Sequence, residues 1–278
     1  VGTPTIDNKI NLDQIKNACL LLGNILKMSK KYISIVIKST VVPSTTDTYV
    51  KNILESTSEM KVGQFGLGMN PEFLREGSAV YDFMNPDRIV FGYEDEKTLE
   101  NLKKIYSSWD VDKLAVNTRS AEMIKYVNNS LLATQISTIN EYSNIANAIG
   151  GIDFNTVMEG VHLDNRWMPI NDGKRIRPSI IDYLKPGCGY GGSCFPKDVK
   201  AISALAKKVG IAPLILDSVI NVNENQPNII VDFLKEKAQG LVNKNILVLG
   251  LAFKPDTDDV RESVSIKILK RLSKENCT

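Results

Sequence analysis

The chain has 278 residues, of which 43% are hydrophobic and 24% are charged, and its formal net charge at pH 7 is +2. This composition is typical of a globular protein of one to three domains with enough apolar material for a sizeable core. The small net charge argues against a nucleic acid or an anionic membrane as partner, and no apolar run approaches the roughly 18 residues of a membrane helix. The four cysteines show no CxxC spacing and the only histidine is His162, so a site of several histidines is excluded and we expect no metal.

The first 118 residues alternate between short apolar segments and helical segments. Near-continuous apolar strands that alternate with helices are typical of a parallel sheet covered on both faces. We therefore predict an α/β fold that starts with a partial Rossmann-like parallel sheet. The expected strands cover residues 32–37, 64–69, 88–92 and 113–116, and the expected helices cover residues 46–55 and 94–107.

The rest of the chain is mostly helical. Apolar residues recur at helical spacing from 119 to 150, where two glycines end the pattern, and this predicts a central long-helix domain. Pro227 is expected to kink or divide the last long helix. A buried strand over 244–250 and a helix over 263–274 predict the start of a second Rossmann-like domain. The other expected helices cover residues 154–160, 197–209 and 214–238, and a loop-rich segment covers 163–193.

Both predicted sheets lack parts that such domains usually contain. No G-x-G-x-x-G occurs in the sequence, and the last domain has one strand and one helix, too little to bury its own faces. We therefore expect this chain to be an internal segment of a longer protein.

The most informative segment is residues 187–198, which read G-C-G-Y-G-G-S-C-F-P-K-D. Closely spaced glycines let the backbone approach a ligand, and the loop brings Cys194 to the start of a helix. Backbone N–H groups and the helix dipole stabilise a thiolate there. Asp198 lies one turn later, where it can orient a water or accept a proton. From the spacing alone, a buried structural cysteine before an ordinary helix is the alternative.

This string resembles the catalytic-cysteine loop of the UDP-glucose/GDP-mannose dehydrogenase family, G-x-G-x-G-G-S-C-x-P-K-D. Other segments follow in the family's order, so the resemblance covers essentially the whole chain. Ser44 stands where the family usually has glycine. The further matching segments are V-G-T-P (residues 1–4), K-S-T-V-V-P-S-T-T (38–46), N-P-E-F-L-R-E-G (70–77), A-E-M-I-K-Y-V-N-N (121–129) and G-L-A-F-K-P-D-T-D-D-V-R-E-S (250–263).

The resemblance implies a role for each matched residue. Cys194 would be the nucleophile, Lys125 and Asn129 would share one helix face and stabilise an oxyanion, and a water would be positioned by Asp198, Glu72 and Thr40. We expect Glu72 and Glu76 to face one cleft from a helix start. The implied NAD-binding residues are Thr3, Pro4, Thr40, Glu76 and Arg261. The implied substrate-binding residues are Phe73, Leu74, Lys125, Asn129, Lys185, Tyr190, Gly191 and Lys254.

For the bare residues, simpler interpretations stand beside these. Thr40 fits a strand end with a hydroxyl-capped turn, Glu72 fits a solvated acidic first turn, and Lys125 fits a solvated lysine. Residues 250–263 fit a charged surface turn. Arg166, Arg175 and Arg177 are further candidates for contact with substrate across a dimer.

The function that the resemblance implies is NAD-dependent oxidation of a nucleotide sugar at C6 to the uronic acid, through a thiohemiacetal and a thioester on Cys194. Lys197-Asp198 after the cysteine favours a UDP-glucose type of substrate. Residues 1–118 would be the C-terminal part of the NAD-binding domain, 119–240 a central helical domain for dimerisation and catalysis, and 241–278 the start of a nucleotide-sugar-binding domain. A cytoplasmic homodimer that serves polysaccharide biosynthesis is also implied. The alternatives are a two-electron hydroxyacid dehydrogenase of the 6-phosphogluconate type, and an inactive nucleotide-sugar-binding fragment.

Overall fold

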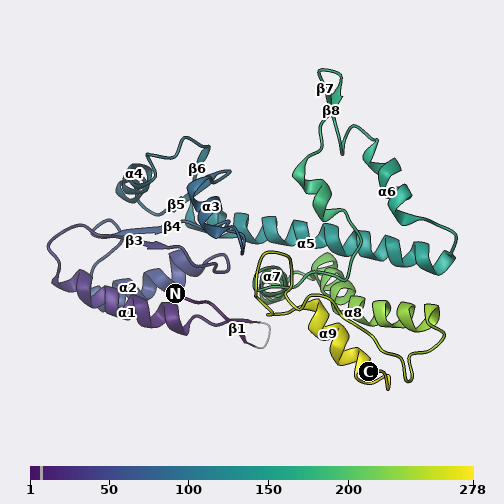
Figure 1. Cartoon of the computed structure of the whole chain (residues 1–278). Coiled ribbons are helices and arrows are strands. Elements are labelled where there is room, and N and C mark those ends of the chain that lie inside the picture. Colours follow the sequence, from purple (N-terminus) through teal and green to yellow (C-terminus); the bar gives the residue numbers. More distant parts are fainter. Residues whose placement is uncertain (7–8) are drawn as a thin grey trace. The chain divides into compact units, whose positions relative to one another are not determined.

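The computed structural model describes residues 1–6 and 9–278, which divide into two compact units. The first unit contains residues 1–128 and 204–210, and the second contains 129–203 and 211–278. The 32-residue helix α5 (Thr118–Ile149) begins in the first unit and ends in the second (Figure 1). The helix predicted over 119–150 is therefore confirmed.

A four-stranded sheet forms the centre of the first unit, and its strands fall where the apolar segments predicted them. The order is β3-β4-β5-β6, and the outer pairs β3–β4 and β5–β6 are parallel. The strands are β3 (Ser34–Ile37), β4 (Gly66–Met69), β5 (Ile89–Tyr93) and β6 (Lys113–Val116).

The central pair β4–β5 is antiparallel, which corrects the expectation of a fully parallel sheet. A parallel pair needs a crossover that returns the chain to the same end of the sheet, usually through a helix of several turns. Between β4 and β5 the chain forms only the six-residue helix α3 (Ala79–Met84), which the sequence did not predict. The chain therefore enters β5 from the end at which it left β4.

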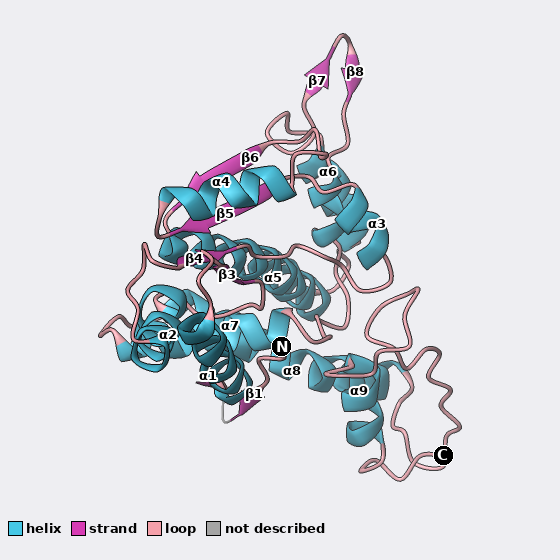
Figure 2. Cartoon of the chain, turned by 90° about the vertical axis from the view of Figure 1, so that its left-hand side faces the viewer, coloured by secondary structure: helices cyan, strands magenta, loops and turns pink. Residues whose placement is uncertain are grey.

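Helices cover both faces of this sheet, as predicted. Neighbouring residues of a strand point to opposite faces, and Ile35 and Val36 of β3 accordingly belong to two different apolar clusters. The first cluster includes α1 (Asp13–Met28) and α2 (Lys51–Ser58), and the second includes α4 (Glu96–Ile105), which runs beside β5 and β6 (Figure 2). Helix α1 was not predicted, although Ile15, Cys19 and Leu26 form a buried stripe at helical spacing.

The first unit also contains a short pair of strands and a short π-helical segment. Strands β1 (Thr5–Ile6) and β2 (Lys9–Ile10) pair in antiparallel orientation. The helix predicted over 46–55 is confirmed, although its first turns, η1 (Thr45–Val50), are π-helical and continue into α2.

The second unit is built from helices around the C-terminal part of α5, and the last residues of α7, 204–208, belong to the first unit. Pro227 lies inside a continuous helix, so the proline does not divide it. Helix α6 confirms the helix predicted over 154–160, α7 confirms the one over 197–209, and α8 confirms the one over 214–238. The elements are α6 (Phe154–His162), β7 (Ile170–Asn171), β8 (Lys174–Arg175), η2 (Ser179–Tyr183), α7 (Phe195–Lys208), α8 (Leu214–Lys237) and α9 (Val264–Leu272).

The strand predicted over residues 244–250 is wrong as stated, because this segment forms no regular ladder. A strand is stabilised by hydrogen bonds to a neighbour, and among the described residues this segment makes such bonds with the last residues of the chain. Thr278 N–H donates to the Lys244 carbonyl at 2.9 Å, and Ile246 N–H donates to the Thr278 carbonyl at 2.7 Å. These hydrogen bonds join residues 244–246 to the segment after α9, but neither segment is a regular strand. The start of a second Rossmann-like sheet therefore stays a prediction. Among residues 1–6 and 9–278, no helix is long and apolar enough to cross a membrane.

Candidate active site

Two loops near the end of β3 lie against each other in the first unit. The Thr3 hydroxyl donates to the Thr40 carbonyl at 2.9 Å, and the Ser39 hydroxyl donates to the Val1 carbonyl at 2.6 Å. The structure therefore brings together the segments that contain Thr3, Pro4 and Thr40. They lie beyond the carboxyl end of β3, which is the edge where open α/β sheets bind ligands.

The turn that follows Thr40 depends on a buried glutamate that the sequence analysis left without a role. Glu122 on α5 is fully buried, and its carboxylate accepts the N–H groups of Ser44 at 2.7 Å and Thr46 at 2.8 Å. Burial raises the pKa of Glu122 to about 7, although the hydrogen bonds from Thr46 and Ser44 lower it. Glu122 thus satisfies amide groups at the start of η1 that would otherwise lack partners.

Ser44 has a φ of 75°, in the left-handed region that favours glycine. This geometry accounts for the glycine that the family usually has at the position. We expect Ser44→Gly to increase the free energy of unfolding by about 0.5–1 kcal/mol, because glycine removes the steric cost of this φ. The matched control is Ser56→Gly within α2, which should lose about 0.5 kcal/mol because glycine disfavours a helix interior. Urea unfolding of both variants measures the difference, and equal losses would contradict the strain argument.

The N-P-E-F-L segment brings three predicted site residues together. Glu72 Oε1 lies 3.2 Å from Lys125 Nζ, and the Phe73 ring centroid lies 5.4 Å from the same nitrogen. Lys125 is only 3% exposed, so the interpretation of a solvated lysine is wrong. Residues 71–75 form no helix, which corrects the expected helix start at Glu72 and Glu76. Pro71 and the hydrogen bond from the Leu74 N–H to the Glu72 carboxylate favour a turn instead.

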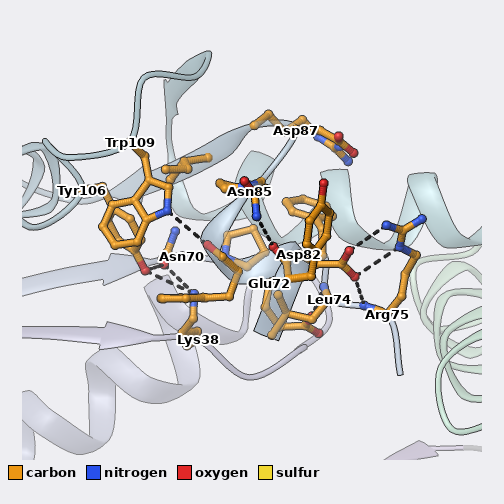
Figure 3. Close-up of a pocket in the computed structure, with 17 residues that line it drawn as sticks. Lys38, Asn70, Glu72, Leu74, Arg75, Asp82, Asn85, Asp87, Tyr106 and Trp109 are labelled. Atoms are coloured by element: carbon orange, nitrogen blue, oxygen red, sulfur yellow. Dashed lines mark hydrogen bonds and ion pairs between the residues drawn. The ribbon is translucent and has the colours of Figure 1, made fainter. Parts of the chain in front are cut away.

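A cavity of about 180 Å³ lies beside this segment, and Glu72, Phe73 and Leu74 form part of its wall (Figure 3). At one side, Lys38 Nζ donates to Asn70 Oδ1 at 2.8 Å, and Tyr106 donates to the same oxygen at 2.5 Å.

At the other side of the cavity, Asp82 accepts from the Arg75 guanidinium at 2.6 Å and from the Arg75 N–H at 2.8 Å (Figure 3). The hydrogen bond from Arg75 holds the pKa of Asp82 at about 2. This pair fixes the turn after Leu74, so the backbone of the Phe73–Leu74 segment is held from both ends.

In the second unit, Asn129 and Asp198 form a buried pair. Asn129 Nδ2 donates to Asp198 Oδ2 at 2.7 Å, and the two residues are 5% and 1% exposed. The ammonium group of the neighbouring Lys197 binds the other carboxylate oxygen. Lys125 and Asn129 are four residues apart on α5, so their side chains leave the same face of that helix.

Cys194 is exposed, which excludes the buried structural cysteine. It directly precedes α7, and its carbonyl accepts the Asp198 N–H at 2.8 Å, so the cysteine stands at the first turn of that helix. Its sulfur lies 3.7 Å from the Ser193 hydroxyl. The structure therefore places an accessible thiol at the N-terminus of α7.

The glycines before Cys194 are explained by close packing against residues 253–262. Gly192 N–H donates to the Arg261 carbonyl at 3.0 Å. A Cβ on Gly191 would lie 2.4 Å from the Glu262 carbonyl oxygen, and one on Gly192, at a φ of 79°, would lie 2.6 Å from the Phe253 ring. Larger residues would separate the two loops, so the structure joins two segments that the sequence analysis treated separately.

Among the remaining candidates in the second unit, Tyr190 packs against helices, and the charged side chains have partners nearby in the sequence. Tyr190 packs in an apolar cluster with Ala133 and Val219. Lys254 Nζ lies 5.6 Å from the Phe253 ring, and the Arg261 guanidinium binds Asp259 at 2.9 Å through two nitrogens. Lys185 and Arg177 both bind Asp182, Arg166 binds Asp164, and Arg175 binds the carbonyls of Leu163 and Met168.

Within the described part of the chain, no cluster of three or more histidine, cysteine or acidic side chains could hold a metal ion. The candidate site residues that the sequence analysis missed are polar: Glu122 and Asn70 are buried, and Lys38 is exposed. Glu122 stands inside a motif that was quoted for its lysine and asparagine, so its position was a usable signal. Lys38 and Asn70 likewise begin two of the quoted motifs.

The fold and these loops define the class of protein to which the chain belongs. Residues 1–110 match the model of the UDP-glucose/GDP-mannose dehydrogenase family NAD binding domain, residues 119–225 match its central domain, and residues 247–278 match its UDP binding domain. The chain is a member of the UDP-glucose/GDP-mannose dehydrogenase family, which confirms the resemblance carried by the motifs.

Individual relatives agree with this assignment. The chain is 43% identical to the UDP-glucose 6-dehydrogenase YwqF of Bacillus subtilis and 39% identical to AglM of Haloferax volcanii, over 98% and 96% of its length. Its structure matches that of a UDP-glucose dehydrogenase from Pyrobaculum islandicum with a TM-score of 0.87 at 38% identity, covering 99% of this chain and 60% of that one. The chain spans 58% of the Bacillus protein and 60% of the Haloferax protein.

Proposed function

We propose that the protein containing this chain oxidises a nucleotide sugar at C6 to the uronic acid, with NAD as hydride acceptor and Cys194 as nucleophile. The observation that carries the proposal is the arrangement at the start of α7. Exposed Cys194 begins the helix, and Asp198, one turn later, is bound to Asn129.

The NAD site that we propose uses the loops beyond β3. The contact between Thr3 and Thr40 forms a shared surface at the carboxyl end of the strand, which suits a dinucleotide in this class of fold. When bound there, the cofactor accepts hydride from the sugar. Thr3, Pro4, Thr40, Glu76 and Arg261 are its proposed contacts.

The chain's own residues would carry the other steps. As hydride leaves C6, the hydroxyl proton passes through a water to the Glu72 carboxylate, or to Lys125 in its uncharged amine form, and an aldehyde forms. The Cys194 thiolate adds to C6 and gives a thiohemiacetal, whose loss of a second hydride gives a thioester. Water positioned by Asp198, Glu72 and Thr40 then hydrolyses the thioester and releases the acid and the thiol.

The charge of Lys125 suits the proposed series of reaction steps. Each tetrahedral step places negative charge on the oxygen of C6, and a buried ammonium group stabilises it more strongly than a solvated one. Lys125 supplies that charge and Asn129 supplies an amide donor. We propose that Phe73, Leu74, Lys185, Tyr190, Gly191 and Lys254 hold the substrate.

The preferred substrate is UDP-glucose. The most similar relatives given above are UDP-glucose dehydrogenases, and Lys197-Asp198 follows the cysteine as in that branch. We propose the domain limits 1–118, 119–240 and 241–278, a cytoplasmic location, and a homodimer through the central helices.

Counting reduced cofactor tests the reaction against the two-electron alternative. Complete oxidation of a limiting amount of UDP-glucose should yield two NADH for each sugar, because conversion of an alcohol to an acid removes two hydrides. Absorbance at the NADH band, with chromatography of the product, measures the ratio. One NADH for each sugar would favour a hydroxyacid-type dehydrogenase, and no turnover with NAD or UDP-glucose binding alone would favour a binding module.

A further inference from the structure

Three buried amide side chains bind the backbone of the loop that leads to Cys194. Asn140 on α5 is 0% exposed, and Asn223 and Gln226 on α8 are 6% and 2% exposed. All three lie in the second unit together with the loop. Their polar groups are directed at Gly187 and Tyr190.

The contacts form two complete pairings with peptide groups. Asn223 Oδ1 accepts the Tyr190 N–H at 2.7 Å, and Asn223 Nδ2 donates to the Tyr190 carbonyl at 3.0 Å. Gly187 is bound from both helices. Its N–H donates to Asn140 Oδ1 at 2.8 Å, and its carbonyl accepts from Gln226 Nε2 at 3.0 Å.

The geometry selects for carboxamides at positions 223 and 226, where each side chain both donates and accepts, whereas Asn140 contributes its acceptor oxygen to Gly187. An amide presents one acceptor and one donor group, so Asn223 matches both the N–H and the carbonyl of one residue. A carboxylate would lose the donor, and an apolar side chain would leave buried peptide groups without partners. Gly189 has a φ of 101°, and a Cβ at this position would lie only 2.6 Å from Asn223 Oδ1. A larger residue would therefore displace the Asn223 side chain.

These bonds hold the loop on one side, and the Gly192–Arg261 bond holds it on the other. Cys194 lies between this second anchor and the first turn of α7. The path of the loop is therefore fixed by side chains from α5 and α8 rather than by the glycine-rich sequence, which is flexible by itself.

We propose that Asn140, Asn223 and Gln226 are positioning residues that hold the Cys194 loop at the N-terminus of α7. The catalytic consequence rests on the function proposed above, whereas the effect on the cysteine itself does not. Loss of one amide group releases the loop and moves the sulfur away from the helix amides.

The test uses Asn223→Asp and Gln226→Glu, which keep size but remove a donor. Asn225→Asp is the matched control, because Asn225 is exposed on the same helix. Its side-chain oxygen accepts a hydrogen bond from Asn228, and aspartate can still accept this bond. The first readout is the rate of Cys194 alkylation by iodoacetamide, located by peptide mass spectrometry, with Cys277 as internal reference.

We expect both variants to slow Cys194 alkylation about fivefold at neutral pH, because the cysteine leaves the N-terminus of α7, a position that favours thiol reactivity, while Cys277 is unaffected. In the protein that contains this chain, kcat should fall about 10- to 100-fold with little change in KM. Asn225→Asp should leave both quantities unchanged.

The proposal is overturned if Cys194 alkylation and kcat match the unmodified protein in both variants. Should Asn223→Asp fail to fold by circular dichroism, Gln226→Glu, which removes the hydrogen bonds that Gln226 Nε2 donates to the Gly187 carbonyl and to Asn144, carries the same test. If the unmodified protein does not oxidise UDP-glucose, the proposed function fails, and the alkylation rates still decide whether the amides position the cysteine.

Discussion

Cys194→Ala should lower uronic acid formation by about a thousandfold or more, because it removes the nucleophile that captures the aldehyde. The structure makes this an informative variant, since Cys194 is exposed and its side chain supports no apolar cluster. The thermal unfolding midpoint should therefore stay within about 1–2 °C of the unmodified protein. Product is measured by chromatography with UDP-glucose and NAD.

The matched control is Cys188→Ala, an exposed cysteine of the same loop for which the proposed reaction has no role. Its acid formation should stay within about twofold of the unmodified protein. Normal acid output from the Cys194 variant would contradict covalent catalysis, whatever the control shows.

Lys125→Met should lower kcat/KM by about 100- to 1000-fold, because it removes the charge that stabilises the oxyanion. Lys125 is 3% exposed and its ammonium nitrogen lies 3.2 Å from Glu72, so no solvent cation can easily replace it. Methionine keeps the length of the side chain, and Lys125→Arg should not restore activity, because a guanidinium is larger and differently shaped.

Steady-state kinetics with UDP-glucose measure the effect of the Lys125 variants. Lys103→Met on the exposed face of α4 is the control and should be neutral. A Lys125→Met enzyme with a kcat/KM within a few-fold of the unmodified protein would show that the ion pair with Glu72 is only structural.

The strands of the first unit were predictable because each is a short apolar segment between polar turns. Helices were predictable where apolar residues recur at regular helical spacing. The direction of β5 was not inferred, although the sequence contained a signal. No long helical segment separates 64–69 from 88–92, so a parallel crossover had no element to form it. Helix α1 was missed because its buried stripe is carried partly by Cys19 and Gly23 rather than by large apolar residues.

Some features of the candidate site could likewise be predicted from the sequence, and others could not. Motif spacing predicted Lys125 and Asn129 on one helix face, and the structure adds a carboxylate partner for each, Glu72 and Asp198. Tertiary partners of this kind cannot be read from one sequence, because they are distant along the chain. The amides of α8 gave no signal at all, since Asn223 and Gln226 stand in a polar stretch that also contains the exposed Asn225.

The most direct test of the account is to look for sugar attached to position 194. In Cys194→Ser the hydroxyl should still capture the aldehyde, and the ester formed after the second hydride transfer should persist, because an alkoxide is a poorer leaving group than a thiolate. After incubation with UDP-glucose and NAD, peptide mass spectrometry should find the UDP-uronyl group on residue 194. Free acid made at the normal rate with residue 194 unmodified would contradict the claim that this side chain carries the sugar.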